Sequence, residues 1–347
     1  MQVMQSPGAT RQGGVPGIPL LEVDNLTMEY QVEAGAVSAV ANVTFDLEAG
    51  ESLGLVGESG CGKTSVAMSL LRLQADNAVF RNGEIRLNGQ NLLALSEPEM
   101  RTHRWKDISM VFQGAMNSWN PVQRVGAQIL EAINLHFRPR PPAAEARKRM
   151  EDLFNLVGVD PKMLDRYPHE FSGGMRQRAT IAMALSCDPQ LIIADEPTTA
   201  LDVIVQDQIL KQLVRIQREL GMAIIYISHD IAVIAEVTQK IAIMYAGRIV
   251  EMGPTKEVFA QPRHPYGYLL LNSAPSITGP RRKLAPLKGE PPNLLKPPSG
   301  CRFHPRCPFA TEKCVNEVPP LEQVGENHFV ECWHWDKVPL SAGKGVA

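Results

Sequence analysis

The segment Ser52-Leu53-Gly54-Leu55-Val56-Gly57-Glu58-Ser59-Gly60-Cys61-Gly62-Lys63-Thr64 contains the strongest structural signal in this chain of 347 residues. Its last eight residues fit the pattern G-x-x-x-x-G-K-[ST] of a phosphate-binding loop. Residues 52–56, which are mostly apolar, predict a buried strand before the loop, and residues 65–73 predict a helix after it. This context is the one that the motif requires. We therefore expect an α/β fold with a phosphate site at a helix N-terminus.

The loop offers both backbone and side-chain groups to a nucleotide. Its glycines let the backbone wrap around phosphates with the N–H groups pointing inward. Lys63 is expected to reach the β- and γ-phosphates, and Thr64 to offer its hydroxyl to Mg²⁺. Cys61 is interpreted as a tolerated small residue, with redox sensing as the alternative. The predicted ATP contacts in this segment are Gly57, Ser59, Gly60, Cys61, Gly62, Lys63, Thr64 and Ser65.

Two carboxylates follow a second apolar run. Residues 191–194 predict a buried strand, and Asp195 and Glu196 come directly after it. In this Walker B arrangement, we expect Asp195 to hold Mg²⁺ and Glu196 to polarise the attacking water as general base. Acidic residues also end strands in proteins without catalytic function. The phosphate loop upstream favours the catalytic interpretation.

Further motifs, in a fixed order along residues 20–260, resemble those of the ABC-type ATPase family. Residues 171–178, FSGGMRQR, resemble its signature motif, and Ala200-Leu201-Asp202 resembles its D-loop. Gln113 resembles the Q-loop glutamine, His229 the switch histidine, and Tyr30 the aromatic residue that stacks on adenine. Each residue alone would have an ordinary structural explanation. Their order along the chain carries the resemblance.

The resemblance implies a role for each of these residues. Glu196, His229 and Gln113 would be catalytic, and Thr64, Gln113 and Asp195 would hold Mg²⁺. The signature lies at a predicted helix start, where free N–H groups attract phosphate. In the family, this motif of one subunit closes on ATP held by another. The residues predicted to contact ATP in this way are Ser172, Gly173, Gly174, Gln177 and Asp202.

The implied architecture is a P-loop, RecA-like ABC ATPase core of mixed α/β structure. An antiparallel β subdomain is expected from the N-terminal strands, and a helical subdomain with the signature motif at about residues 105–185. Residues 1–19 are expected to form a flexible tail before the ATPase domain of residues 20–260. Residues 261–347 are expected to form a small, irregular, cysteine-rich extension.

The composition of the chain changes near residue 261. The last 87 residues contain 14 of the 27 prolines and four of the six cysteines. Proline breaks helices and sheet interiors, and periodic apolar sequence is scarce here. We therefore expect an extension without a core of its own, which a metal or cross-link must hold together.

The start of this extension resembles the corresponding region of oligopeptide and dipeptide (peptide/nickel) importer ATPases. The similar features are His264-Pro265-Tyr266, then Leu269-Leu270-Leu271, and a proline-rich stretch to Pro298. Basic residues are concentrated in residues 281–306, which predicts a solvated basic surface. The alternative is that these basic residues form a rim around a thiolate cluster or contact lipid headgroups. The basic residues are Arg281, Arg282, Lys283, Lys288, Lys296, Arg302 and Arg306.

Four cysteines of the extension, Cys301, Cys307, Cys314 and Cys332, have the spacing C-x5-C-x6-C-x17-C. Structural zinc sites typically use shorter C-x2-4-C knuckles, whereas four thiolates also suit iron–sulfur clusters. The resemblance to peptide importers implies a 4Fe–4S cluster. Zinc, and free or disulfide-linked cysteines, remain the alternatives.

Composition limits the class of protein. The formal net charge of −2 does not suggest a nucleic-acid partner. No apolar run approaches the ~20 residues of a membrane-spanning helix, and the N-terminus lacks the apolar core of a signal peptide. We therefore expect a peripheral protein on the cytoplasmic face of the cell membrane.

The resemblance implies an ATP-hydrolysing motor that drives import of peptides or similar solutes. Its partners would be a second, related ATPase subunit, two membrane permease subunits and an extracellular solute-binding protein. A soluble ABC ATPase acting on nucleic acid, ribosomes or iron–sulfur assembly is the rival class. A regulatory subunit that does not hydrolyse ATP is a third hypothesis, against which Glu196 and His229 argue.

Overall fold

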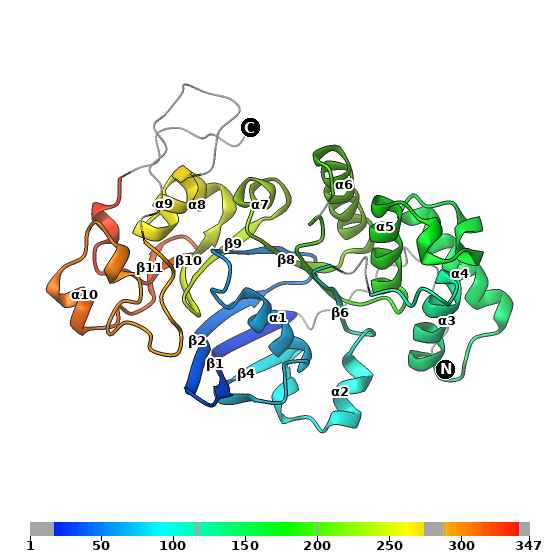
Figure 1. The fold of residues 1–347 in the computed structure, drawn as a ribbon, viewed down its shortest axis with the longest axis horizontal. Coiled ribbons are helices and arrows are strands. Elements are labelled where there is room, and N and C mark those ends of the chain that lie inside the picture. The colour runs from blue at the N-terminus through cyan, green and yellow to red at the C-terminus, as the bar shows by residue number, and fades with distance from the viewer. Residues whose placement is uncertain (1–16, 115–117, 200, 274–286, 288, 340–347) are drawn as a thin grey trace. The chain divides into compact units, whose positions relative to one another are not determined.

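The computed structural model describes residues 17–114, 118–199, 201–273, 287 and 289–339 (Figure 1). The chain divides into two compact units. The first unit comprises Met1–Leu20, Glu48–Glu51 and Ala94–Ile225, and the second comprises Leu21–Leu47, Ser52–Leu93 and Tyr226–Ala347. The boundary falls inside strand β8 (Ala223–Ser228). Most of the expected N-terminal tail, residues 1–16, lies outside the described residues.

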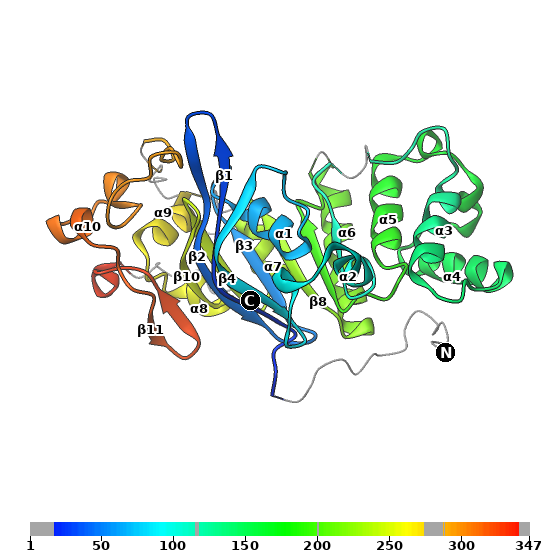
Figure 2. The ribbon, with the colours of Figure 1, turned by 90° about the horizontal axis from the view of Figure 1, so that it is seen from below.

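The second unit contains an antiparallel sheet, which confirms the sequence prediction. Its strand order is β2-β1-β4-β5, and Figure 2 shows the three long strands side by side. Alternate residues at the start of β1 are buried, as the period-two pattern of a half-buried strand requires. Leu21 pairs with Leu47 on one side and with Leu87 on the other. The strands are β1 (Leu21–Val32), β2 (Gly35–Leu47), β4 (Ala78–Leu87) and β5 (Gln90–Asn91).

A second group of strands in this unit carries the phosphate loop. All five residues of β3 (Ser52–Val56) are buried, as predicted, and the strand runs parallel to β9 (Lys240–Tyr245). Strand β9 continues through a tight turn into the antiparallel β10 (Arg248–Pro254). The helices of the unit are α1 (Lys63–Leu71), α7 (Ile231–Val237), α8 (Thr255–Ala260) and α9 (Pro265–Ser273), with η1 (Leu92–Ala94) at the unit boundary.

The C-terminal extension is built partly into this sheet. Strand β12 (His328–Val330) pairs antiparallel with β10, and β11 (Glu322–Gly325) pairs with β12. The extension therefore continues a regular sheet, although its prolines led us to expect irregular structure. Its remaining elements are short: η5 (His304–Arg306), α10 (Glu312–Asn316) and η6 (Trp335–Lys337).

One phenylalanine of the extension contributes to the core of the second unit. The Phe303 side chain is 1% exposed, and its ring lies edge-on to Tyr245 at 5.0 Å between centroids. The rings of Tyr266 and His264 lie 5.4 Å and 5.7 Å from it. The expectation that only a metal or cross-link could hold the extension was therefore wrong, because aromatic burial also stabilises it.

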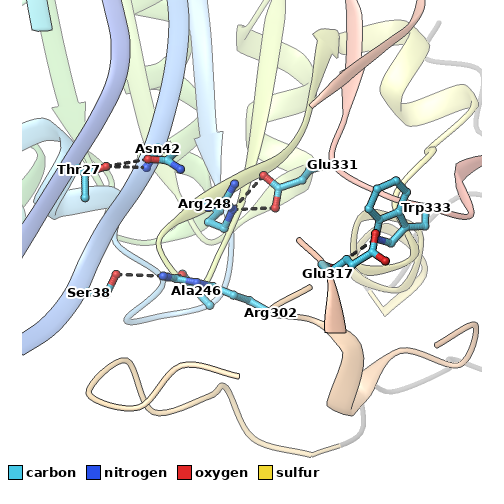
Figure 3. A network of polar contacts seen from close by, with 9 residues as sticks. All are labelled: Thr27, Ser38, Asn42, Ala246, Arg248, Arg302, Glu317, Glu331 and Trp333. Atoms are coloured by element: carbon cyan, nitrogen blue, oxygen red, sulfur yellow. Dashed lines mark hydrogen bonds and ion pairs between the residues drawn. The ribbon is translucent and has the colours of Figure 1, made fainter. Parts of the chain in front are cut away.

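Arginine side chains anchor the extension in addition. Arg302 donates to the carbonyl of Ala246 and, at 3.0 Å, to Ser38 Oγ. Arg248 on β10 donates to both oxygens of Glu331, at 2.7 and 2.9 Å (Figure 3). The expected solvated basic surface is thus wrong for Arg302, whose guanidinium is hydrogen-bonded inside the protein, and for Arg306, whose side chain is 5% exposed and paired with Glu58. Of the other basic residues in that prediction, Arg281, Arg282, Lys283 and Lys288 lie outside the described residues.

The first unit combines a pair of parallel strands with a group of helices. The strands are β6 (Ile108–Val111) and β7 (Leu191–Asp195), which pair in register from Ile108 with Leu191. Within the described residues, no helix combines the length and apolar character that crossing a membrane requires. The helices are α2 (Glu97–His103), α3 (Val125–His136), α4 (Ala143–Leu156), η3 (Pro161–Asp165), η4 (Pro168–Glu170), α5 (Gly173–Ala184) and α6 (Val203–Leu220).

Candidate functional site

The phosphate loop joins β3 to α1, and its shape depends on two glycines. Gly57 and Gly62 have positive φ angles of 154° and 108°. A Cβ atom on Gly57 would lie 2.2 Å from the carbonyl oxygen of Met244, and one on Gly62 would lie 2.3 Å from that of Ala39. Because only glycine fits such contacts, these two positions require the residues that the motif specifies.

Lys63 lies inside the loop, with 7% of the residue exposed. Its Nζ donates to the carbonyls of Gly57 at 2.8 Å and Glu58 at 2.9 Å. The ammonium group is therefore held over the loop by its backbone. Tyr30, expected to stack on adenine, lies close to the same helix, because its hydroxyl is 3.4 Å from Ser65 Oγ.

Glu58 has contacts that the sequence did not predict. Its carboxylate accepts two hydrogen bonds from the guanidinium of Arg306, at 2.6 and 3.0 Å. Its backbone N–H donates to the hydroxyl of Tyr266 at 2.9 Å. Both partners belong to the region after residue 260, more than 200 positions along the chain. No local pattern could have indicated these contacts.

In the first unit, Gln113 and Glu196 meet. Gln113 Nε2 donates to Glu196 Oε2 at 2.8 Å, and Thr199 Oγ1 donates to the same oxygen at 2.9 Å. Glu196 has a φ of 46°, in the left-handed region that a non-glycine residue rarely adopts. Asp195, 1% exposed, ends β7 just before it. Thr199 was missed, although a threonine three residues after a candidate base is a detectable local signal.

The signature residues begin helix α5. Ser172 is exposed and is the N-cap, and its Oγ accepts from the N–H of Met175 at 3.3 Å. Asp202 caps α6 in the same way, accepting from Val205 N at 3.0 Å. A Cβ on Gly174 would lie 2.8 Å from the side chain of Val205, so this glycine lets α5 and α6 approach closely. Unlike Ser172, Gln177 is buried, with 4% exposed.

The predicted nucleotide residues are divided between the two units. The second unit holds the phosphate loop, Tyr30 and His229, which is exposed and directly follows β8. The first unit holds the others: Gln113, Asp195, Glu196, Ser172, Gly173, Gly174, Gln177 and Asp202. Ala200 of the D-loop lies outside the described residues. Within the first unit, the structure brings together Gln113 and Glu196, and the signature helix and the D-loop helix.

The four cysteines of the extension line one small cavity. Its volume is about 10 Å³, roughly the space for one water molecule. Within the described residues, no group of three or more His, Cys, Asp or Glu is arranged as a metal site. The sulfur donors thus share one cavity, and four sulfur donors are a ligand set that chemically suits a metal bound by thiolates. The lining cysteines are Cys301, Cys307, Cys314 and Cys332.

Three thiols of this cavity, those of Cys301, Cys307 and Cys332, are hard to ionise. Burial raises the pKa of Cys301 and Cys332 to about 12, and that of Cys307 to about 11. The charges of neighbouring cysteines add to the rise. A positive metal centre would reverse this effect, because a coordinating thiol is deprotonated by the cation.

Comparisons with known proteins agree with the motifs. Residues 40–199 match the family described as "ABC transporter", and residues 250–314 match "Oligopeptide/dipeptide transporter, C-terminal region". The chain is 46% identical to the oligopeptide transport ATP-binding protein OppD of Salmonella typhimurium, covering 93% of this chain and 96% of the relative. It is 45% identical to the probable peptide ABC transporter ATP-binding protein y4tR of Sinorhizobium fredii, over 92% and 96% of the two chains.

Solved structures show the same fold. The dimeric structure of MJ0796, a bacterial ABC transporter cassette, matches with a TM-score of 0.61 and 26% identity, covering 68% of this chain and 98% of that one. CbiO1 from Clostridium perfringens, part of an ABC transporter complex, matches with a TM-score of 0.60 and 27% identity, covering 70% and 91%. The chain is an ABC ATPase that belongs to the ATP-binding proteins of the oligopeptide/dipeptide ABC transporter family.

Proposed function

We propose that this chain is the ATP-hydrolysing motor of an importer for peptides or similar solutes. The relatives described as peptide and oligopeptide transport ATP-binding proteins align along nearly their whole length. The match extends into the C-terminal region, which a soluble non-transport ABC ATPase has no need to share. These two findings favour transport over action on nucleic acid, ribosomes or iron–sulfur assembly.

The observation that supports hydrolysis most directly is the contact of Gln113 with Glu196, at 2.8 Å. Gln113 and Thr199 both donate to one carboxylate oxygen of Glu196, and together they orient the carboxylate as a general base requires. We assign Glu196 as base, His229 and Gln113 as its catalytic partners, and Thr64, Gln113 and Asp195 as the Mg²⁺ site. Lys63 and the loop N–H groups would bind the phosphates of ATP.

We further propose that a second ATPase subunit completes the site. Ser172 is exposed at the N-terminus of the 12-residue helix α5, where N–H groups and the helix dipole favour a phosphate. The remaining partners would be two permease subunits in the membrane and an extracellular solute-binding protein, with no nucleic acid. The motor would act at the cytoplasmic face of the cell membrane, and the second ATPase would be a related but different chain.

The cysteine cavity is proposed to hold a 4Fe–4S cluster in a structural or assembly role. The presence of four sulfur donors on one cavity supports ligation by thiolates. Zinc is the alternative metal. With either metal bound, the ligands would fix Cys301, Cys307, Cys314 and Cys332 relative to one another.

Transport by the assembled complex tests the main proposal. The chain would be reconstituted in vesicles with its permeases, the second ATPase and the binding protein, and uptake of a labelled peptide would be followed. We expect uptake to require ATP and to be lost with Glu196→Gln. If ATP is hydrolysed at the normal rate in the complete complex but no peptide, metal chelate or oligosaccharide is taken up, the transport assignment is wrong.

A further inference from the structure

Glu58, the second residue of the phosphate loop, is held at its side chain and at both backbone groups. Arg306 binds the carboxylate through two hydrogen bonds, at 2.6 and 3.0 Å. Tyr266 accepts from the backbone N–H, at 2.9 Å. Lys63 donates to the backbone carbonyl, at 2.9 Å. The C-terminal region and the loop lysine therefore act on the same residue.

We propose that Arg306 and Tyr266 are positioning residues of the phosphate loop, through which the C-terminal extension sets the affinity for ATP. This inference rests on the proposed function only in that the loop binds ATP phosphates. The extension would then act on nucleotide binding as well as on assembly of the transporter complex. The shape of the motor's own binding loop depends on a segment that follows the ATPase domain.

The first argument is the geometry of the Arg306 contact. A planar guanidinium on both oxygens of a carboxylate fixes distance and orientation together. The Arg306 side chain is 5% exposed and that of Glu58 25%, so solvent screens this pair less than an ordinary surface pair. Arg306 also donates to the hydroxyl of Tyr245 at 3.3 Å, which fixes the guanidinium from a second side.

The second argument concerns the loop backbone. The N–H groups that follow Glu58 must converge on phosphate oxygens, and their directions depend on the peptide planes beside Glu58. Because Tyr266 and Arg306 hold the N–H and the carboxylate of Glu58, they fix the orientation of these peptide planes before ATP binds. A binding site that is already ordered loses less conformational entropy on binding. Release of Glu58 should therefore weaken ATP binding.

A third contact acts on the same loop by another route. The N–H of Gly247, in the turn between β9 and β10, donates to the carbonyl of Cys61 at 2.8 Å. Arg302 of the extension holds the preceding residue, Ala246, by its carbonyl (Figure 3). Arg306 thus reaches the start of the phosphate loop directly, at Glu58. Arg302 reaches the middle of the loop indirectly, through the turn whose Gly247 N–H bonds Cys61.

The chain provides a matched control for this proposal. Arg248 and Glu331 form another largely buried ion pair that anchors the extension, in which the Nε–H of Arg248 is shared by both carboxylate oxygens, at 2.7 and 2.9 Å. In the part of the chain that the structure describes, these two side chains bond to each other and not to the phosphate loop. If the extension matters only for stability, loss of either pair should have the same consequence. If Arg306 positions the loop, only its loss should change ATP binding.

The test measures binding of a fluorescent ATP analogue to the full chain, with thermal unfolding recorded for each variant. We expect Arg306→Gln to raise the Kd about tenfold, which corresponds to about 1.4 kcal/mol. Tyr266→Phe should raise it about threefold. Arg248→Gln should lower the melting temperature but leave the Kd within twofold of that of the unchanged chain.

A double-mutant cycle identifies the pair itself. Glu58→Gln should weaken binding less than Arg306→Gln, because it also removes a negative charge from an anion-binding loop. In the double variant, the Kd should be no higher than for Arg306→Gln alone, which indicates coupling. If Arg306→Gln fails to fold, Arg306→Lys, which cannot form the two-bond contact, replaces it.

Two results would overturn the inference. One is unchanged ATP affinity in Arg306→Gln, or its Lys replacement, and in Tyr266→Phe. The other is an equal loss of affinity in Arg248→Gln. Either result leaves the proposed ATPase function intact, whereas absence of ATP binding by the unchanged, folded chain would contradict that function instead.

Discussion

Gln113 and Glu196 are 83 positions apart in the chain, yet Gln113 Nε2 lies 2.8 Å from Glu196 Oε2. Thr199 donates to the same oxygen, at 2.9 Å. Two residues thus orient the candidate base: Gln113, in the segment that follows β6, and Thr199, in the turn that begins at Glu196. Its backbone adopts a φ of 46°, a conformation that other contacts must sustain and that is often found at functional sites.

Glu196→Gln tests the assignment of the base. The change preserves side-chain size but removes the proton acceptor. We expect ATP binding to persist and hydrolysis at this site to fall by ~10²–10⁴-fold, as is typical after loss of a general base. Phosphate release would be measured in a complex whose other ATP site is disabled. Near-normal turnover in that complex would contradict the assignment.

Lys63→Ala and Ser172→Arg separate the two kinds of phosphate contact. Lys63→Ala should abolish ATP binding by this chain, because the loop loses its one ammonium group. Ser172→Arg should leave that binding unchanged but prevent closure on ATP held by a second subunit, since a bulky side chain would fill the helix N-terminus. Equilibrium ATP binding and nucleotide-dependent dimerisation would be measured. Loss of ATP binding by the isolated chain in Ser172→Arg would contradict the shared site.

Local patterns predicted the parts of the fold that local physics determines. The five buried residues of β3 and the glycines at 57 and 62 follow from burial and backbone freedom. The antiparallel sheet and the helical signature region followed from the family resemblance. The contacts of Phe303, Arg302 and Arg306 were not predicted, because each joins segments far apart in sequence. A basic residue in a proline-rich stretch gives no local sign that its partner lies in another element.

The same limit applies to the candidate site. Motif order identified Gln113 and Glu196 without indicating that they form a hydrogen bond. Glu58 occupies a position that the motif leaves unspecified, so its role in joining the loop to the extension was not visible. Glu251 likewise gives no sequence signal, although the fold buries it completely.

Glu251→Gln should destabilise the second unit. The buried carboxylate accepts from the N–H groups of Arg263 and His264, at 2.6 and 3.0 Å, and contacts His328 Nε2 at 2.9 Å. An amide has one acceptor oxygen, so at least one buried donor loses its partner, at a cost of about 1–3 kcal/mol. Urea unfolding would measure this loss, with the exposed Glu322→Gln as the control. Equal stability of the two variants would contradict the prediction.

His264 should make the stability of the chain sensitive to acid. Burial lowers the pKa of this histidine to about 3, and its Nδ1 accepts from the N–H of Tyr266 at 3.0 Å. Below pH 6.5 the unfolded state binds a proton that the folded state excludes. The free energy of unfolding therefore falls as pH falls, by up to about 1.4 kcal/mol per pH unit above pH 3.

The measurement is urea unfolding at pH 7.5 and pH 5.5. The control is His264→Asn, whose side-chain oxygen can replace Nδ1 as acceptor but does not titrate. This variant should lose about 1 kcal/mol less stability than the unchanged chain over that range. The same pH dependence in both proteins would exclude His264 as the cause.

The last prediction concerns Cys314 and the proposed cluster. Burial disfavours the thiolate form of its neighbours Cys301, Cys307 and Cys332, and a bound metal would offset this effect by deprotonating the thiols that coordinate it. Because aromatic burial and arginine pairs also anchor the extension, we expect loss of the cluster to weaken complex assembly without unfolding the chain. Protein purified without oxygen should be brown and contain iron and acid-labile sulfide. Cys314→Ser should lose both, whereas Cys187→Ser, a buried cysteine outside the cavity, should keep them. If the protein is colourless and contains one equivalent of zinc, the site is a zinc site and the cluster assignment is wrong. Metal-free protein that assembles normally would exclude both metals.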